Sequence, residues 1–382
     1  MTVSIERVRD LAVRQAGGPV LSVYLRTDPR ELANMAATPG WVIELRNELR
    51  DVIRRSHDEE RSVQPSGLRD LCERVERDVL ALEPSERGRG LAWFLTPDAS
   101  LDERFTLQSP PQETLVRWDD HPFVSPLVDL VDRGRPTGLV LLSAEAVRLL
   151  RWQMGRVDEP ERPLYEFELG EWRDYAGYVG HADRSAGGMH VATFSNRIDD
   201  WRKRFLSDAA SATAKQVADL GWHRLALIGE PRVADAFASR LPTHIRERVV
   251  ATVDTNLIWE EPAAVAERVE PTLDDAWRRE TRTLVEAAVR TAAAGGAAAL
   301  GWAEVLDCLL QGRVDHLVFA ADATPDPDLL APHIRRALGD PTRLMLVERA
   351  VELAVSASAE VSAITGDVAL ADAGGVAAVL RY

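Results

Sequence analysis

The chain has 382 residues, of which 46% are hydrophobic and 28% charged. Two or three globular domains are expected at this length and composition. Acidic residues outnumber basic ones by 61 to 46, and the net charge of −15 excludes a cationic coat that would bind nucleic acid over the whole surface. Cys72 and Cys308 stand far apart, which excludes a zinc ribbon or a disulfide framework.

The same composition argues against a membrane protein. Each apolar stretch falls short of the about 20 residues that span a bilayer. The N-terminal residues lack the basic region and apolar core of a signal peptide. We therefore expect a cytoplasmic protein.

Residues 1–135 are predicted to form an N-terminal α/β domain. Apolar runs at 20–25 and 90–95 are typical of strands, and the first follows a Gly-Gly-Pro turn. Helical spacing with charged outer faces marks 41–56 and 66–82. The domain closes at an apolar run over 124–131 and a Gly- and Pro-containing turn.

Two further segments follow the first domain. Residues 136–256 form a predicted central domain, in which strands at 138–143 and 224–229 are connected by a helix over 195–220, as in a parallel crossover. The stretch 146–153 pairs as a hairpin with the first of these strands. After an acidic, Pro-marked linker at 257–271, residues 272–382 form a C-terminal α/β sandwich. Its predicted elements are helices at 272–294 and 301–310 and strands at 314–320, 359–364 and 376–381.

Most standard catalytic motifs are missing from the sequence. It has no nucleophile elbow, phosphate loop, zinc-protease motif or dinucleotide-binding glycine fingerprint. None of the eight histidines stands at metal-ligand spacing with another, so we expect neither a metal nor a cofactor. Asp119-Asp120-His121 resembles an acid–base cluster, but a polar turn before Pro122 is the favoured interpretation. For Arg26 and Arg30, a turn is likewise favoured over contact with RNA.

The stretch 170–205 is the most unusual part of the chain. Its middle, 177–193, has no usable period and is predicted to be a long flexible loop, with Gly187-Gly188-Met189 near the tip. Paired glycines let the backbone approach a ligand closely. Basic residues around the loop and on the following helix are candidates for holding phosphates, and their alternative interpretation is a solvated helix face. They are Arg184, Arg197, Arg202, Lys203 and Arg204.

Several strings resemble one family, the bacterial relatives of the archaeal and eukaryotic class I peptide release factor and of Pelota. The strings lie at 19–25 (PVLSVYL), 120–127 (DHPFVSPL), 304–318 (EVLDCLLQGRVDHLV) and 374–382 (GGVAAVLRY). The C-terminal strings are the most specific, and the resemblance extends over the whole chain. It implies an α/β protein of three domains, with a ribonuclease-H-like central domain and a C-terminal domain that resembles kink-turn-binding ribosomal proteins.

The resemblance further implies a protein that enters the ribosomal A site in place of a tRNA. In catalytic members of the family, the central loop ends in Gly-Gly-Gln and supports hydrolysis of peptidyl-tRNA. Here Gly187 and Gly188 match the two glycines, but Met189 replaces the glutamine, and 170–215 contains no other glutamine. Met offers a weak thioether acceptor and no amide donor, and the loss of one catalytic polar contact commonly costs roughly 10²–10³ in rate.

Two functions therefore stay open. The first is a peptidyl-tRNA hydrolase of ribosome rescue or termination, with Gly187, Gly188 and Met189 at the reactive end. The second is a non-catalytic ribosome-binding factor of stress or hibernation, which the missing glutamine favours. A scaffold repurposed for another partner is a third possibility. The expected partners are ribosomal RNA and the P-site tRNA, with a translational GTPase as a candidate for delivery, and we expect a monomer.

Overall fold

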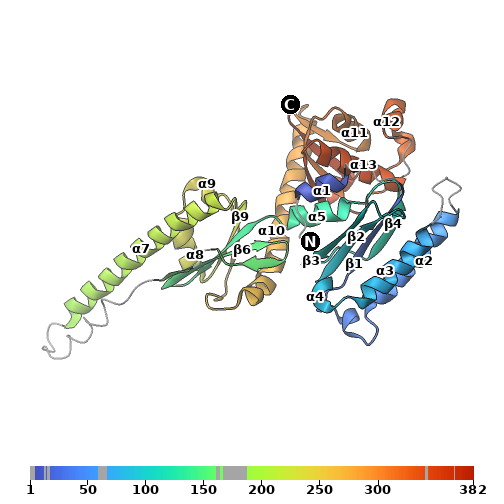
Figure 1. The fold of residues 1–382 in the computed structure, drawn as a ribbon. Helices are drawn as coiled ribbons and strands as arrows, with labels where there is room; N and C mark the ends of the chain where they lie inside the picture. Colours follow the sequence, from blue (N-terminus) through green and yellow to red (C-terminus); the bar gives the residue numbers. More distant parts are fainter. Residues whose placement is uncertain are drawn as a thin grey trace. The chain divides into compact units, whose positions relative to one another are not determined.

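The computed structural model describes residues 5–12, 14, 18–58, 67–160, 164–166, 187–339, 343–364 and 366–382. The chain divides into two compact units. The terminal unit combines Met1–Gly134 with Trp277–Tyr382, and the central unit is Arg135–Ala276. Figure 1 shows the elements of both units in chain order.

The N-terminal part of the terminal unit is an antiparallel sheet in the order β3-β2-β1-β4. Helices α2 and α3 cover it, and they share a core with β1 and β2 that includes Leu45, Val75 and Trp93. These strands and helices confirm the predicted ones. The bounds are α1 Ile5–Ala12, β1 Val20–Arg26, η1 Leu32–Met35, α2 Gly40–Asp58, α3 Leu68–Ala81, α4 Pro84–Arg87, β2 Gly90–Leu95, β3 Asp102–Leu107, β4 Leu115–Asp119 and α5 Ser125–Arg133.

The C-terminal part of the same unit has a sheet in the order β11-β14-β12-β13. Strands β12 and β13 are parallel, whereas β14 is antiparallel to both β11 and β12. The predicted strands are confirmed, and the short β11, in an Ala-rich stretch, was not predicted. The bounds are β11 Ala298–Leu300, α11 Trp302–Leu310, β12 Val314–Ala320, η2 Pro327–Leu329, α12 Pro332–Ala337, α13 Arg343–Ser356, β13 Glu360–Ile364, α14 Val368–Asp372 and β14 Val376–Leu380.

The central unit contains the largest sheet, with its strands in the order β10-β9-β5-β6-β7 and with β8 paired to β6. Strand β5 is parallel to β9 and antiparallel to β6, which confirms the predicted crossover and hairpin. Each face of the sheet has its own core. The bounds are β5 Thr137–Leu142, β6 Ala146–Gln153, β7 Arg156–Asp158, β8 Leu164–Glu166, α7 Gly187–Asp219, β9 Arg224–Ile228, α8 Pro231–Ala238, α9 Thr243–Arg246 and β10 Val249–Val253.

Helix α10 begins earlier than the sequence predicts. Helix α10 spans Pro262–Ala293 and contains Pro271, whereas we expected a linker to 271 and a helix from about 272. Pro262 stands at the first helical position, where a proline costs nothing because the first N–H of a helix has no partner within it, whereas Pro271 lies inside the helix. Residues 262–276 of α10 belong to the central unit, and the rest belong to the terminal unit. The predicted limits of the three domains stay a prediction.

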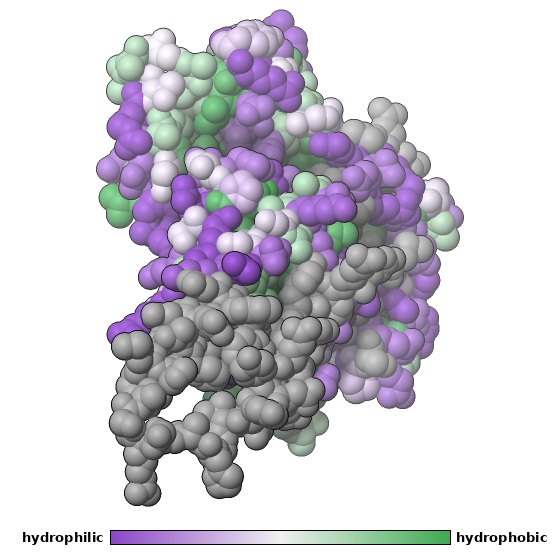
Figure 2. Space-filling view, turned by 90° about the vertical axis from the view of Figure 1, so that its left-hand side faces the viewer, coloured by the Kyte–Doolittle hydropathy of each residue, from purple (hydrophilic) through white to green (hydrophobic). Residues whose placement is uncertain are grey.

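The mixed α/β class is confirmed by the three sheets and the helices that accompany them. Within the described ranges, no helix is long and apolar enough to cross a membrane. Hydrophilic side chains cover most of the described surface on the face drawn in Figure 2, as expected from 28% charged residues.

Candidate functional site

The glycine pair lies at the start of the longest helix of the central unit. Helix α7 begins at Gly187, so Gly187, Gly188 and Met189 form its first turn. The expectation of a loop up to residue 193, with a helix only from about 195, is therefore wrong over 187–193. The remainder of that predicted loop, 177–186, lies outside the described residues, and Arg184 lies there too.

Helix α7 is anchored through its C-terminal half. Leu206, Ala210 and Val217 are buried there and pack in the core on one face of the central sheet. In Figure 1, the other half of α7 runs beyond this sheet. At 1.5 Å per residue, Gly187 lies about 28 Å along the helix from Leu206. The central unit thus holds its glycine pair at the end of a rod.

The predicted basic residues, Arg184 apart, fall on this rod. Arg197 and Arg202 belong to α7, and their side chains lie outside the described ones. Lys203 and Arg204 are exposed. Lys203 and Arg204 lie two to three residues before the buried Leu206, about 24 Å along the helix from Gly187, so the positive charge they supply is near the anchor of α7.

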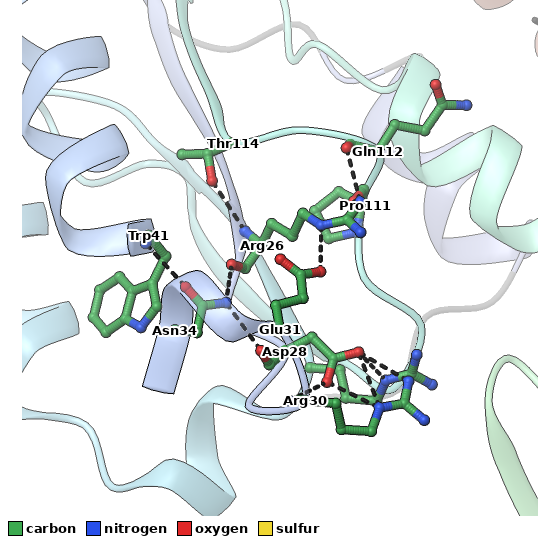
Figure 3. Close-up of polar contacts among 10 residues, drawn as sticks. Arg26, Asp28, Arg30, Glu31, Asn34, Trp41, Pro111, Gln112 and Thr114 are labelled. Atoms are coloured by element: carbon green, nitrogen blue, oxygen red, sulfur yellow. Dashed lines mark hydrogen bonds and ion pairs between the residues drawn. The ribbon is translucent and has the colours of Figure 1, made fainter. Parts of the chain in front are cut away.

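Arg26, the last residue of β1, and Arg30, which follows the strand, are engaged in a polar cluster within the terminal unit (Figure 3). The Arg26 guanidinium donates to Glu31, at 2.5 Å, and to the carbonyl oxygens of Pro111 and Gln112. Asp28 is buried, with 3% of its surface exposed, and pairs with Arg30 at 2.9 Å and with Arg89 at 2.8 Å. These pairs hold a turn, in agreement with the favoured interpretation.

The stretch Asp119-Asp120-His121, for which a polar turn is the favoured interpretation, lies beside a buried glutamate. Asp119 and His121 line a small pocket together with Phe123, Glu348, Arg349 and Glu352. Burial raises the pKa of Asp119 above its usual range and raises the pKa of Glu348 to about 8. Glu348 was not among the residues predicted from sequence. Its signal was a pair of glutamates, 348 and 352, four residues apart in a largely apolar helix.

Glu348 on α13 holds the start of α5. Its carboxyl group accepts the backbone N–H groups of Val124, at 2.5 Å, and of Ser125, at 3.3 Å, and is also hydrogen-bonded to the Ser125 hydroxyl. The next residue, Pro126, has no N–H to satisfy. From the other side, the Tyr24 hydroxyl donates to the carbonyl of Phe123 at 2.6 Å. This pocket therefore contains a structural joint, in which Glu348 connects α13 to the start of α5.

A second buried network surrounds Asp132 at the other end of α5. The Trp277 indole donates to Asp132 at 2.9 Å, and the Ser362 hydroxyl donates to the same oxygen at 2.6 Å. His316 lies 2.8 Å from Ser362 and 3.3 Å from Glu360. This order of carboxylate, imidazole and hydroxyl is that of a hydrolase triad. Ser362 is only 2% exposed and is bonded to Asp132, so the network is structural.

The part of the chain that the structure describes gives no support for a metal site or a cysteine nucleophile. That part contains no group of three or more His, Cys, Asp or Glu side chains placed to hold a metal ion. Burial raises the pKa of the Cys72 thiol to about 12, and it also raises that of Cys308. Neither cysteine therefore has the thiolate character of a nucleophile.

Comparison with known proteins connects the central unit to translation factors. Residues 122–273 match the model of bacterial archaeo-eukaryotic release factor family 10, a range that contains β5, β6, α7 and β9. The resemblance to bacterial relatives of the class I release factor is thereby confirmed. The uncharacterized protein Rv2629 of Mycobacterium tuberculosis (strain ATCC 25618 / H37Rv) is 26% identical over 407 aligned positions, which cover 99% of this chain and 96% of Rv2629. The uncharacterized protein YocB of Bacillus subtilis (strain 168) is 21% identical over 253 positions, 65% of this chain and 91% of YocB.

Solved structures with similarity to the chain are also translation factors. Archaeal translation termination factor aRF1 is 15% identical and covers 100% of this chain and 99% of its own, with a TM-score of 0.26. Ribosome-bound archaeal Pelota is 12% identical, covers 100% and 95%, and has a TM-score of 0.40. Saccharomyces cerevisiae Dom34, a translation termination-like factor, is 12% identical, covers 77% and 79%, and has a TM-score of 0.38. Because these scores are below 0.5, the family match over 122–273 is the firmer link.

Proposed function

We propose that this chain, whose residues 122–273 match the bacterial archaeo-eukaryotic release factor family 10, is a release-factor-like protein of translation that binds the ribosomal A site. The observation that carries the proposal is the content of the matched range. It contains the whole of α7, and with it the glycine pair and most of the predicted RNA-binding residues. A cytoplasmic location and a role for a translational GTPase in delivery belong to the same proposal.

The geometry of α7 supports a role at the P-site tRNA. The helix carries Gly187 about 28 Å beyond its buried anchor at Leu206. The first N–H groups of a helix lack partners within it and favour anions such as phosphate. Glycine at this end leaves the backbone open to close approach by a tRNA acceptor end. Lys203 and Arg204, exposed along the same helix, supply charge for RNA phosphates.

Occupancy of the ribosome without hydrolysis is the better supported of the two predicted activities. Met189 stands where catalytic members of the family have glutamine, and 170–215 contains no glutamine to take its place. A thioether cannot donate a hydrogen bond, so it cannot position the attacking water as an amide does. The hydrolase is the second candidate, because backbone N–H groups at Gly188 and Met189 could still stabilise an oxyanion.

A release assay on purified ribosomes separates these activities. Ribosomes carrying peptidyl-tRNA in the P site are mixed with the protein, and ribosome binding and peptide release are measured in the same samples. We expect binding without release above the rate in buffer alone. Release by the wild-type protein would establish the hydrolase instead. In the variant Met189→Gln, a gain of release would identify the missing amide as the only defect.

A further inference from the structure

A short loop of the terminal unit presents apolar side chains to solvent. It follows β1 and contains the 3-10 helix η1, Leu32–Met35, none of whose residues is buried. Leu32 is 86% exposed and Met35 is 63% exposed. We define the apolar tip as the exposed apolar residues of this loop, namely Leu32, Ala33, Met35, Ala36 and Ala37. Exposed large apolar side chains that lie close together mark interaction sites more often than isolated ones do.

Asn34, at the centre of the tip, holds the loop in one shape (Figure 3). Its amide nitrogen donates to the carbonyl of Asp28 at 2.9 Å and lies 3.4 Å from the carbonyl of Arg26. Its amide oxygen accepts the backbone N–H of Trp41 at 3.1 Å. A single side chain thus connects the end of β1, the tip and the first turn of α2.

Two other features fix the base of the loop. The ion pairs of Arg26 with Glu31 and of Asp28 with Arg30 and Arg89 lie beneath it. Gly40 lets the loop approach α2 closely, because a Cβ there would lie 2.9 Å from the Cβ of Ala33. A loop that is ordered before it binds loses less conformational entropy on binding. The polar groups therefore hold the loop in place, and the exposed apolar side chains face solvent.

The chemistry of the tip favours a protein partner over RNA. Residues 32–39 carry no charge. The neighbouring guanidinium groups of Arg26, Arg30 and Arg89 are paired with the carboxylates of Glu31 and Asp28. RNA binding depends on cations that neutralise phosphates, and the tip offers none. Leucine and methionine instead gain by leaving water for an apolar pocket, and methionine is enriched at protein interfaces.

We propose that the apolar tip inserts into an apolar pocket on a protein component of the ribosome. This inference rests on the proposed function and names a partner for the terminal unit. Leu32 and Met35 fill the pocket, and Asn34 holds them in the binding shape.

The test uses the full chain and purified 70S ribosomes. Binding is measured for the wild type, for the double variant Leu32→Ser/Met35→Ser, and for the matched control Leu329→Ser. Leu329 lies on η2 of the same unit and is 79% exposed. We expect binding of the double variant to weaken by roughly tenfold or more and that of the control by less than about twofold. Equal binding of wild type and double variant would overturn the inference alone. If the wild type does not bind, the proposed function and the inference both fail.

Cross-linking identifies the class of partner. Met35 is replaced by the photoreactive p-benzoyl-phenylalanine, and the ribosome-bound protein is irradiated. We expect an adduct to a ribosomal protein that survives ribonuclease. An adduct to RNA, an adduct to this chain's own central unit, or no adduct would each contradict the proposal. The variant Asn34→Ala keeps both apolar side chains and loosens the loop. Its binding is expected to fall between those of the wild type and the double variant, and unchanged binding would refute the role of Asn34.

Discussion

The carboxyl group of Glu348 accepts the backbone N–H of Val124 across 224 residues of sequence, at 2.5 Å. Val124 is the N-cap of α5, and its own side chain cannot cap the helix. A glutamate from the last part of the chain thus supplies the acceptor that α5 lacks. This contact and the Asp132 network at the other end of α5 join the two parts of the terminal unit.

Removal of the Glu348 carboxylate is predicted to destabilise the terminal unit. In Glu348→Ala, the buried N–H groups of Val124 and Ser125 lose their acceptor, and this costs about 1–3 kcal/mol. Urea unfolding followed by circular dichroism measures the loss. The exposed Glu44 of α2 provides the matched control, and Glu44→Ala should change the unfolding free energy by less than about 0.5 kcal/mol. Equal stability of the two variants would contradict the capping role.

The raised pKa of Glu348 predicts that stability falls as the pH rises. An unfolded carboxyl group titrates near about 4.3, whereas Glu348 in the folded protein titrates at about 8 because it is buried. Between these values the folded state holds a proton that the unfolded state has released, so the unfolding free energy decreases with pH and levels off above about 8.

Glu348→Gln isolates this contribution. Burial also raises the pKa values of Tyr24 and Asp119, so the wild type contains more than one contribution. The difference in unfolding free energy between wild type and Glu348→Gln should change steadily from about pH 5 to pH 8. A difference that stays constant over this range would show that Glu348 is already ionised in the folded protein.

In the second network, replacement of Asp132 is predicted to lower the stability more than replacement of Ser362. Asp132→Ala leaves the buried indole N–H of Trp277 and the hydroxyl of Ser362 without this acceptor, at a cost of roughly 2–4 kcal/mol. Ser362→Ala removes one partner and should cost about 1 kcal/mol. Thermal unfolding compares both with Asp315→Ala, whose carboxylate is 65% exposed and should matter little. If Asp132→Ala is no worse than Asp315→Ala, the network does not hold α5.

The basic residues of α7 are predicted to contribute to ribosome binding through phosphates. Lys203→Ala/Arg204→Ala should weaken ribosome binding severalfold. The slope of the logarithm of the binding constant against the logarithm of the salt concentration should also fall, by the contribution of up to about two phosphate contacts. Arg54→Ala, which removes a 70% exposed arginine on α2, is the control. Binding measured over a series of salt concentrations gives both quantities. An unchanged salt dependence in the double variant would place the RNA contacts elsewhere.

Local sequence patterns predicted those strands and helices that depend on the residues within them. The continuous apolar run at 90–95 became a central strand that is buried at every position, because only burial on both faces suits such a run. The short β11 was missed because Ala and Gly carry little strand signal. The start of α7 was missed because Gly187 and Gly188 are poor helix formers.

The joint of the terminal unit depends on distant residues and could not be predicted from local sequence. Asp119 and His121 were recognised as polar, but nothing near them in sequence points to Glu348. Likewise, nothing in the sequence around Arg26 shows that Glu31 and the carbonyl of Pro111 engage it. Sequence identified the residue types, and only the fold assigned them to structural pairs.

Co-sedimentation of the 382-residue chain with purified 70S ribosomes is the decisive test of ribosome binding. The wild-type chain is expected to move with the 70S peak in a sucrose gradient at physiological salt, and less of the variant Lys203→Ala/Arg204→Ala is expected to move with it. A wild-type protein that stays at the top of the gradient, with ribosomes in excess and P-site tRNA present, would contradict the claim that this is a ribosome-binding release-factor-like protein.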